Sequence, residues 1–193
     1  MGIAHGKRQR VNFNGATYHV STRCNNKEYL IKRSLDFEKF KLVLKQCKEK
    51  FGFLLHNYIP MNNHVHLIIR LELILDISKI MHSINRQYAR WYNGYYGRKG
   101  HFWEDRFYSE LIKDDFQLLA AMRYIDLNPV RAGLCRKPTD WKYSGARFYL
   151  NDVKDDLIDM PEIYKNLGAD AKSRQNAYSN IFPLNLPILT RLD

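Results

Sequence analysis

Alternating and helical spacings of apolar residues predict four strands and two long helices in the first 112 residues. Runs in which β-branched and aromatic residues alternate with polar ones are typical of strands, whereas apolar residues three or four positions apart are typical of helices. The predicted elements, in chain order, are a strand at 18–23, a helix from Ser34 or Asp36 to about Lys50, strands at 53–60 and 64–71, a helix at 77–92 and a strand at 102–112. This βαββαβ order predicts an α+β, ferredoxin-like fold, an antiparallel sheet with helices on one face.

A further helix is predicted after the fourth strand. Asp114 or Asp115 can cap its start, and apolar residues recur at helical spacing through Ile125. Pro129 is expected to end this helix near Asn128, because the residue before a proline disfavours helical geometry. The ferredoxin-like unit is therefore expected to carry one added C-terminal helix.

The length of 193 residues suggests one domain with an appendage. Residues 1–150 are expected to form that domain, with a basic and loosely held arm at 1–14. Residues 151–193 show no sharp periodicity, which suggests a short helical appendage or a partly ordered tail of unknown role. No segment approaches the roughly 20 apolar residues of a membrane span, and the three widely spaced cysteines fit a reducing compartment, so a cytoplasmic protein is expected.

The charge changes this picture, because 31 Lys and Arg against 20 Asp and Glu give a net charge of +11. Such an excess favours a polyanionic partner. Many aromatic residues lie among the arginines, and cations that bind phosphates next to rings that stack on bases suit single-stranded nucleic acid. The candidate DNA contacts are Arg86, Arg90, Arg98, Lys99 and Arg106, together with Lys7, Arg8 and Arg10 in the arm.

His64 and His66 are candidate metal ligands. They lie two apart in a predicted strand, so their side chains share one face and can bind the same cation. The alternative is a pair of ordinary surface or core histidines. A histidine-triad hydrolase would need a third histidine two positions further on, and that position is Ile68.

Tyr124 and Asn128 lie four apart on the predicted added helix and therefore share a helical face. The amide oxygen of Asn128 can bind a hard cation. A phenol beside a metal-bound phosphate can attack phosphorus and form a phosphotyrosine. Each residue alone is also compatible with a purely structural role, as a helix-face aromatic and as a residue at a helix end.

Taken together, these motifs resemble those of a known family. The motifs are PMNN at 60–63 followed by HVH at 64–66, then FWEDRFY at 102–108, then YIDLNPVRAGL at 124–134. In this order the chain resembles the single-tyrosine HUH transposases, where HUH denotes His, a hydrophobic residue and His. The closest resemblance is to the REP-associated tyrosine transposases, and it extends from about Tyr18 to Leu150.

The resemblance implies a single-stranded DNA transposase that cleaves and rejoins strands, often beside a hairpin, through a 5′-phosphotyrosine. It implies Tyr124 as the nucleophile, and His64, His66 and Asn128 as ligands of a divalent cation, Mg²⁺ or Mn²⁺. Tyr108 is a rival nucleophile, but the residue four positions beyond it is Ile112, which cannot bind a metal. Relatives work as monomers or as homodimers, and the sequence leaves that choice open.

Two other functions are compatible with parts of the sequence. A relaxase or replication initiator would use the same histidine and tyrosine chemistry, but the chain is short and shows no P-loop. A non-catalytic or domesticated nucleic-acid-binding protein could use the same βαββαβ sheet, as RNA recognition domains do. Such domains carry an aromatic strand signature that this sequence lacks.

Overall fold

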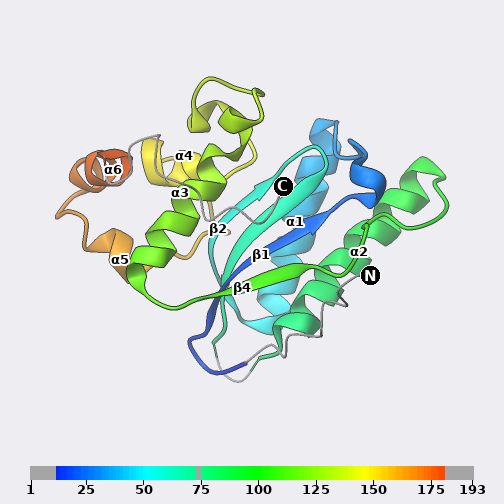
Figure 1. The fold of residues 1–193 in the computed structure, drawn as a ribbon, viewed down its shortest axis with the longest axis horizontal. Helices are drawn as coiled ribbons and strands as arrows, with labels where there is room; N and C mark the ends of the chain where they lie inside the picture. Colours follow the sequence, from blue (N-terminus) through cyan, green and yellow to red (C-terminus); the bar gives the residue numbers. More distant parts are fainter. Residues whose placement is uncertain (1–11, 73–74, 181–193) are drawn as a thin grey trace, which may run out of the picture.

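The computed structural model describes residues 12–72 and 75–180, and Figure 1 shows its fold. The elements are β1 (Thr17–Arg23), η1 (Asn25–Lys27), α1 (Ser34–Phe51), β2 (Leu54–Pro60), β3 (His64–Arg70), α2 (Ile77–Tyr96), β4 (Tyr108–Ile112), α3 (Asp115–Arg131), η2 (Pro138–Asp140), α4 (Ala146–Asn151), α5 (Glu162–Lys165) and α6 (Ala171–Asn180). No helix in these described ranges is long and apolar enough to cross a membrane.

The four strands form one sheet in the order β2-β3-β1-β4, and every neighbouring pair is antiparallel. β1 and β3 are central, which fits the run of buried residues along β3. This order, with βαββαβ connectivity, confirms the predicted ferredoxin-like α+β fold.

Helices cover both faces of the sheet. α1 and α2 lie together on one face, where the ring centroids of Phe40 and Tyr88 are 5.3 Å apart and both side chains are fully buried. Burying side chains of this size contributes roughly 1.5–3 kcal/mol each. α3 lies on the other face, where it contacts β2, β3 and β4 (Figure 1). The added helix therefore crosses the face on which residues 64 and 66 of β3 are expected.

α2 is one turn longer than its sequence pattern predicted. It passes through Asn93 and Gly94 and ends at Tyr96, where Gly97 takes a left-handed conformation at φ 62°. The Tyr96 hydroxyl donates to the Asp36 carboxylate of α1 at 2.7 Å. This tertiary contact and the packing of neighbouring rings hold the last turn, although an Asn-Gly pair favours a helix end.

Two further boundaries differ from the prediction. β4 begins at Tyr108, and the residues before it form an irregular segment that meets β1 through a single bridge between Cys24 and Trp103. α3 contains Pro129 and continues to Arg131 instead of ending near Asn128. A proline removes one N–H bond near the helix end, and here the buried ring and the bond from the Ala132 amide to the Asn128 carbonyl retain the last turn.

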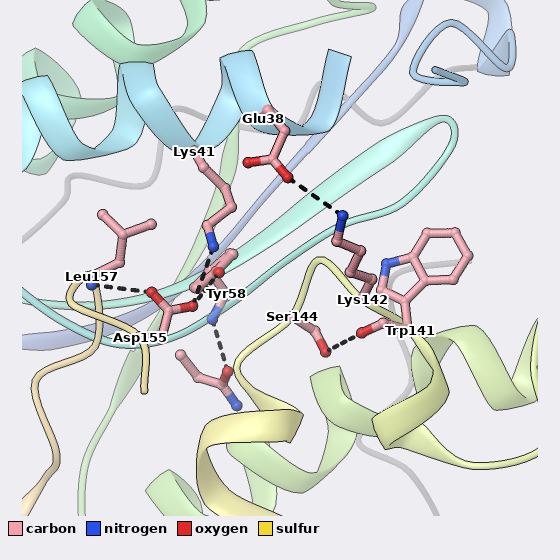
Figure 2. Close-up of polar contacts among 9 residues, drawn as sticks. Glu38, Lys41, Tyr58, Trp141, Lys142, Ser144, Asp155 and Leu157 are labelled. Atoms are coloured by element: carbon pink, nitrogen blue, oxygen red, sulfur yellow. Dashed lines mark hydrogen bonds and ion pairs between the residues drawn. The ribbon is translucent and has the colours of Figure 1, made fainter. Parts of the chain in front are cut away.

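The C-terminal segment packs back on the domain. Asp155 accepts a hydrogen bond from the Tyr58 hydroxyl of β2 and pairs with Lys41 of α1 at 3.4 Å, as Figure 2 shows. Tyr178 of α6 is fully buried and donates to Asp126 of α3 at 2.8 Å. Within residues 152–180 the C-terminal segment therefore contains two helices, α5 and α6, that pack on the domain. Residues 181–193 lie outside the described residues.

Candidate active site

The register of the two central strands brings three histidines to one face of the sheet. His64 and His66 of β3 share that face because strand side chains alternate. Ser21 of β1 lies opposite His66, so His19, two residues before Ser21, points to the same side. His19 and His66 are buried, and His64 is half-buried.

The three imidazoles form a connected group. The ring centroids of His64 and His66 are 5.0 Å apart, and those of His19 and His66 are 5.1 Å apart. His19 Nε2 lies 3.0 Å from His66 Nδ1, within hydrogen-bond distance. The structure thus adds His19 to the pair that the HVH motif indicated.

Asn63 fixes the orientation of His64. The Asn63 amide nitrogen donates to the Lys27 carbonyl at 3.3 Å, and its amide oxygen lies 2.7 Å from His64 Nδ1. Because a carbonyl oxygen can only accept, His64 carries a proton on Nδ1. In the neutral ring the other nitrogen, Nε2, then carries no proton.

α3 brings Tyr124 against these histidines. The Tyr124 ring centroid is 5.7 Å from that of His66 and 5.8 Å from that of His19, edge-on in both cases. The side chain is half-buried, and the guanidinium carbon of Arg131 lies 5.3 Å from the ring centroid. Tyrosine and histidines of one chain therefore meet at one site. Tyr108 lies on β4, opposite Ser21 of β1, and is exposed.

Asn128 lies one helical turn beyond Tyr124. Its side-chain nitrogen donates to the Tyr124 backbone carbonyl at 3.2 Å. That bond uses the amide donor, so the Asn128 amide oxygen keeps its lone pairs for another group. The Tyr124 and Asn128 side chains are both half-buried, which leaves each accessible from the surface.

Burial keeps the inner imidazoles neutral. It lowers the pKa of His19 from 6.5 to about 4. It also lowers the pKa of His66 well below its usual value, and the charges of His19, His64 and Arg23 add to the effect. Near pH 7 both rings therefore hold one proton each and present one lone pair, which is the form that binds cations.

The residue types at this site include side chains that can bind a divalent cation. Within residues 12–72 and 75–180, no three His, Cys, Asp or Glu side chains are grouped closely enough to hold a metal ion. The Asn128 amide oxygen is a candidate donor of another residue type. Imidazole nitrogens bind divalent transition metals, and an amide oxygen is a ligand type that suits Mg²⁺ and Mn²⁺.

Three of the predicted DNA contacts line one open groove of about 890 Å³. Arg86 and Arg90 come from α2, and Arg106 comes from the irregular segment before β4. That segment is held on α2 by the Trp103 indole, which donates to the Asn85 carbonyl at 2.9 Å. Residues 102–107 of the FWEDRFY motif thus form one wall of this groove, called here the basic groove, although Glu104 and Asp105 also line it.

Two other predicted DNA contacts, Arg98 and Lys99, are not among the residues that line this groove. Arg98 donates to the His101 carbonyl at 2.7 Å and lies 3.8 Å from the Glu28 carboxylate. Lys99 is exposed but is not part of the groove wall. Lys7, Arg8 and Arg10 lie outside the described residues.

His19 is the site residue that the sequence did not indicate. It belongs to a strand that was predicted, and alternation alone shows that it shares a face with Ser21. What alternation cannot show is which residue of β3 lies opposite. That information is in the register between two strands more than forty residues apart.

Comparison with known proteins agrees with the fold and motifs. Residues 12–128 match the family model described as "Transposase IS200 like". A Haemophilus influenzae protein named as a REP-associated tyrosine transposase is 27% identical over 128 residues, which cover 61% of this chain and 71% of that protein. A solved structure of a REP-associated tyrosine transposase bound to a REP hairpin shares the fold, with a TM-score of 0.66, 20% identity and coverage of 80% of this chain and 94% of the other. Because the family model spans more than half of its length, the chain belongs to the IS200-like transposase family.

Proposed function

We propose that this chain cleaves and rejoins single-stranded DNA through a covalent bond to Tyr124. The observation that carries the proposal is the packing of the Tyr124 ring against His66 and His19, at centroid distances of 5.7 and 5.8 Å within one chain. A phenol beside imidazoles at a half-open site is an arrangement in which a tyrosine can act as a nucleophile.

In this proposal His64, His66 and Asn128 hold a divalent cation, Mg²⁺ or Mn²⁺. When bound, such a cation neutralises charge on a scissile phosphate and polarises its P–O bonds. The support comes from the chain itself, because His64 bonds to Asn63 through Nδ1 and the Asn128 amide oxygen is not used by the bond to Tyr124.

Tyr124 acts as the nucleophile. Its phenol oxygen forms a bond to phosphorus, the bond from phosphorus to the 3′ oxygen breaks, and that oxygen leaves as a 3′-OH with a proton. The phosphate stays on Tyr124 as a 5′-phosphotyrosine. A 3′-OH from another strand end then attacks the same phosphorus and releases the phenol, so each bond broken is replaced and no nucleotide cofactor is consumed. Arg131 beside the ring favours the negative charge that develops in both steps.

The substrate we propose is a single strand next to a hairpin, because the solved relative is bound to a REP hairpin. The basic groove of Arg86, Arg90 and Arg106 is the proposed contact with the phosphates of that strand. Its aromatic wall, with Trp103, suits unpaired bases better than a regular duplex.

The test is a covalent adduct between the chain and a single-stranded oligonucleotide that carries a hairpin, in the presence of Mn²⁺. We expect an adduct with the unmodified chain, none with Tyr124→Phe, and an undiminished yield with Tyr108→Phe, which removes the rival hydroxyl. A His64→Ala/His66→Ala variant should also form none.

The proposal is wrong if Tyr124→Phe still forms the adduct. It is also wrong if the unmodified chain binds hairpin strands tightly but forms no adduct with any of them, which would indicate a non-catalytic binding protein. Release of a joined product on addition of a free 3′-OH strand separates a transposase from a nuclease that only cuts.

A further inference from the structure

His19 is not among the proposed metal ligands, yet it is buried against one of them, His66. From this contact we infer that His19 is a positioning residue: it accepts the Nδ1 proton of His66 and so turns the free Nε2 of that ring toward the cation. The inference rests on the proposed metal site. The nitrogen-to-nitrogen distance of 3.0 Å between His19 Nε2 and His66 Nδ1 carries it.

The proton count on His66 makes an acceptor necessary. A neutral imidazole has one protonated and one bare nitrogen, so a ring that binds a cation through Nε2 must keep its proton on Nδ1. His66 is only 3% exposed, so water does not readily reach that N–H. A buried donor without a partner is costly, and the nitrogen within reach is His19 Nε2.

The neighbouring ligand is arranged in the same way. His64 Nδ1 donates to the Asn63 amide oxygen at 2.7 Å, so Nε2 carries no proton in the neutral ring. Each proposed histidine ligand thus has an acceptor for its Nδ1 proton, from the adjacent residue for His64 and from the neighbouring strand β1 for His66. Two independent acceptors that fix the same tautomer in both rings indicate a site built to present two Nε2 atoms.

The location of His19 suits this role better than direct attack on DNA. Its side chain is 7% exposed, and its ring also packs edge-on against Tyr124 at a centroid distance of 5.8 Å. His19 therefore contacts both the proposed metal ligand His66 and the proposed nucleophile Tyr124. A change at His19 should alter cation binding without removing any ligand.

The first measurement is the affinity of the full chain for Mn²⁺ by titration calorimetry, with no DNA present. His19→Leu keeps much of the volume but has no acceptor, and we expect it to bind Mn²⁺ about 10–100-fold more weakly. His19→Gln can offer an amide oxygen near the position of Nε2, and we expect it to stay within about threefold of the unmodified chain. His56→Leu removes another buried histidine, of β2, and should bind Mn²⁺ as the unmodified chain does.

The second measurement is made on the unmodified chain, and a variant serves only to assign one signal. Long-range ¹H–¹⁵N NMR spectra of the ¹⁵N-histidine-labelled chain show which ring nitrogen carries the proton, with and without Mg²⁺, and a His66→Gln spectrum assigns the signal. We expect the His66 proton on Nδ1 in both states. A His66 proton on Nε2 in the unmodified chain overturns the inference, as does a folded His19→Leu variant with unchanged Mn²⁺ affinity.

These readouts keep the two proposals apart. If the unmodified chain binds no Mn²⁺, the proposed metal site is wrong, and the position of the His66 proton still decides whether His19 is its acceptor. If the chain binds Mn²⁺ and forms the adduct but His66 carries its proton on Nε2, the proposed function is supported and the proposed role of His19 is wrong.

Discussion

At the scale of single residues, the histidines of this chain show how position decides protonation. His19, His56 and His66 are all buried, and burial lowers the pKa of each. Their hydrogen bonds differ. His19 and His66 bond to one another beside Tyr124, whereas His56 bonds to a backbone carbonyl in the C-terminal segment. The same residue type therefore serves a candidate site in one place and the fold in another.

His56 should make folding stability depend on pH. Its Nδ1 donates to the Asp159 carbonyl at 2.7 Å, and burial is the main cause of its lowered pKa. Below about pH 6.5 the unfolded chain protonates this ring while the folded chain does not. The unfolded state then binds more protons, so the free energy of unfolding falls as the pH falls through this range.

We expect this loss to be smaller in His56→Gln. Urea unfolding of both chains in metal-free buffer between pH 7.5 and 5 measures it. The stability advantage of the unmodified chain should be constant above about pH 7 and shrink toward pH 5. Since the comparison is between two chains that differ at one residue, other titrating groups cancel. An advantage that stays constant over the whole range contradicts the prediction.

At the scale of elements, the basic groove is a property of α2 and the segment before β4 taken together. Arg86 and Arg90 are one turn apart on the helix, and Arg106 faces them from the other wall. Neither element alone forms a concave basic surface. The groove depends on the Trp103 indole bond to α2, which fixes the distance between the walls.

The salt dependence of DNA binding tests the groove. Replacing Arg86, Arg90 or Arg106 by Ala should each reduce the slope of log K against log salt concentration by roughly 0.7 for a single strand, if each contacts one phosphate. Fluorescence anisotropy of a labelled hairpin strand measures the slope. Lys154→Ala removes an exposed lysine from the C-terminal segment and should leave the slope unchanged. Equal slopes for all four variants contradict a DNA contact in the groove.

Most elements could be predicted because their signals are local. The strand that carries His64 and His66, and the left-handed Gly52 that ends α1, follow from alternation and helix-end chemistry. The errors lie where tertiary contacts override those signals. Tyr96 holds the last turn of α2 through Asp36, and buried Pro129 is tolerated inside α3.

The candidate site was predictable in part for the same reason. The HVH spacing and the four-residue step from Tyr124 to Asn128 are local patterns. The partnership of His19 with His66 depends on strand register, and the groove depends on how a loop packs on a helix. Both are products of packing between distant segments, which spacing along the chain does not encode.

At the scale of the whole molecule, the C-terminal segment holds α3 on the sheet of its own chain. Asp126 of α3 accepts hydrogen bonds from Asn57 of β2 at 2.9 Å and from Tyr178 of α6 at 2.8 Å. All three side chains are buried. α3 is therefore held by hydrogen bonds to β2 and to α6. Because Tyr124 is part of α3, these bonds also hold Tyr124 near the histidines.

This arrangement predicts that a single chain supplies the whole site. A mixture of Tyr124→Phe and His64→Ala/His66→Ala chains would regain adduct formation only if α3 of one chain served the histidines of another. Breaking the buried bonds of Asp126 to release α3 is costly, because a buried carboxylate that loses its partners is strongly destabilised. We therefore expect no adduct from the mixture, measured on denaturing gels with the hairpin strand and Mn²⁺. Equal amounts of the unmodified chain and the double histidine variant, which should give the yield of the unmodified chain alone, form the control. An adduct from the mixture of inactive chains would mean that α3 is exchanged between two copies.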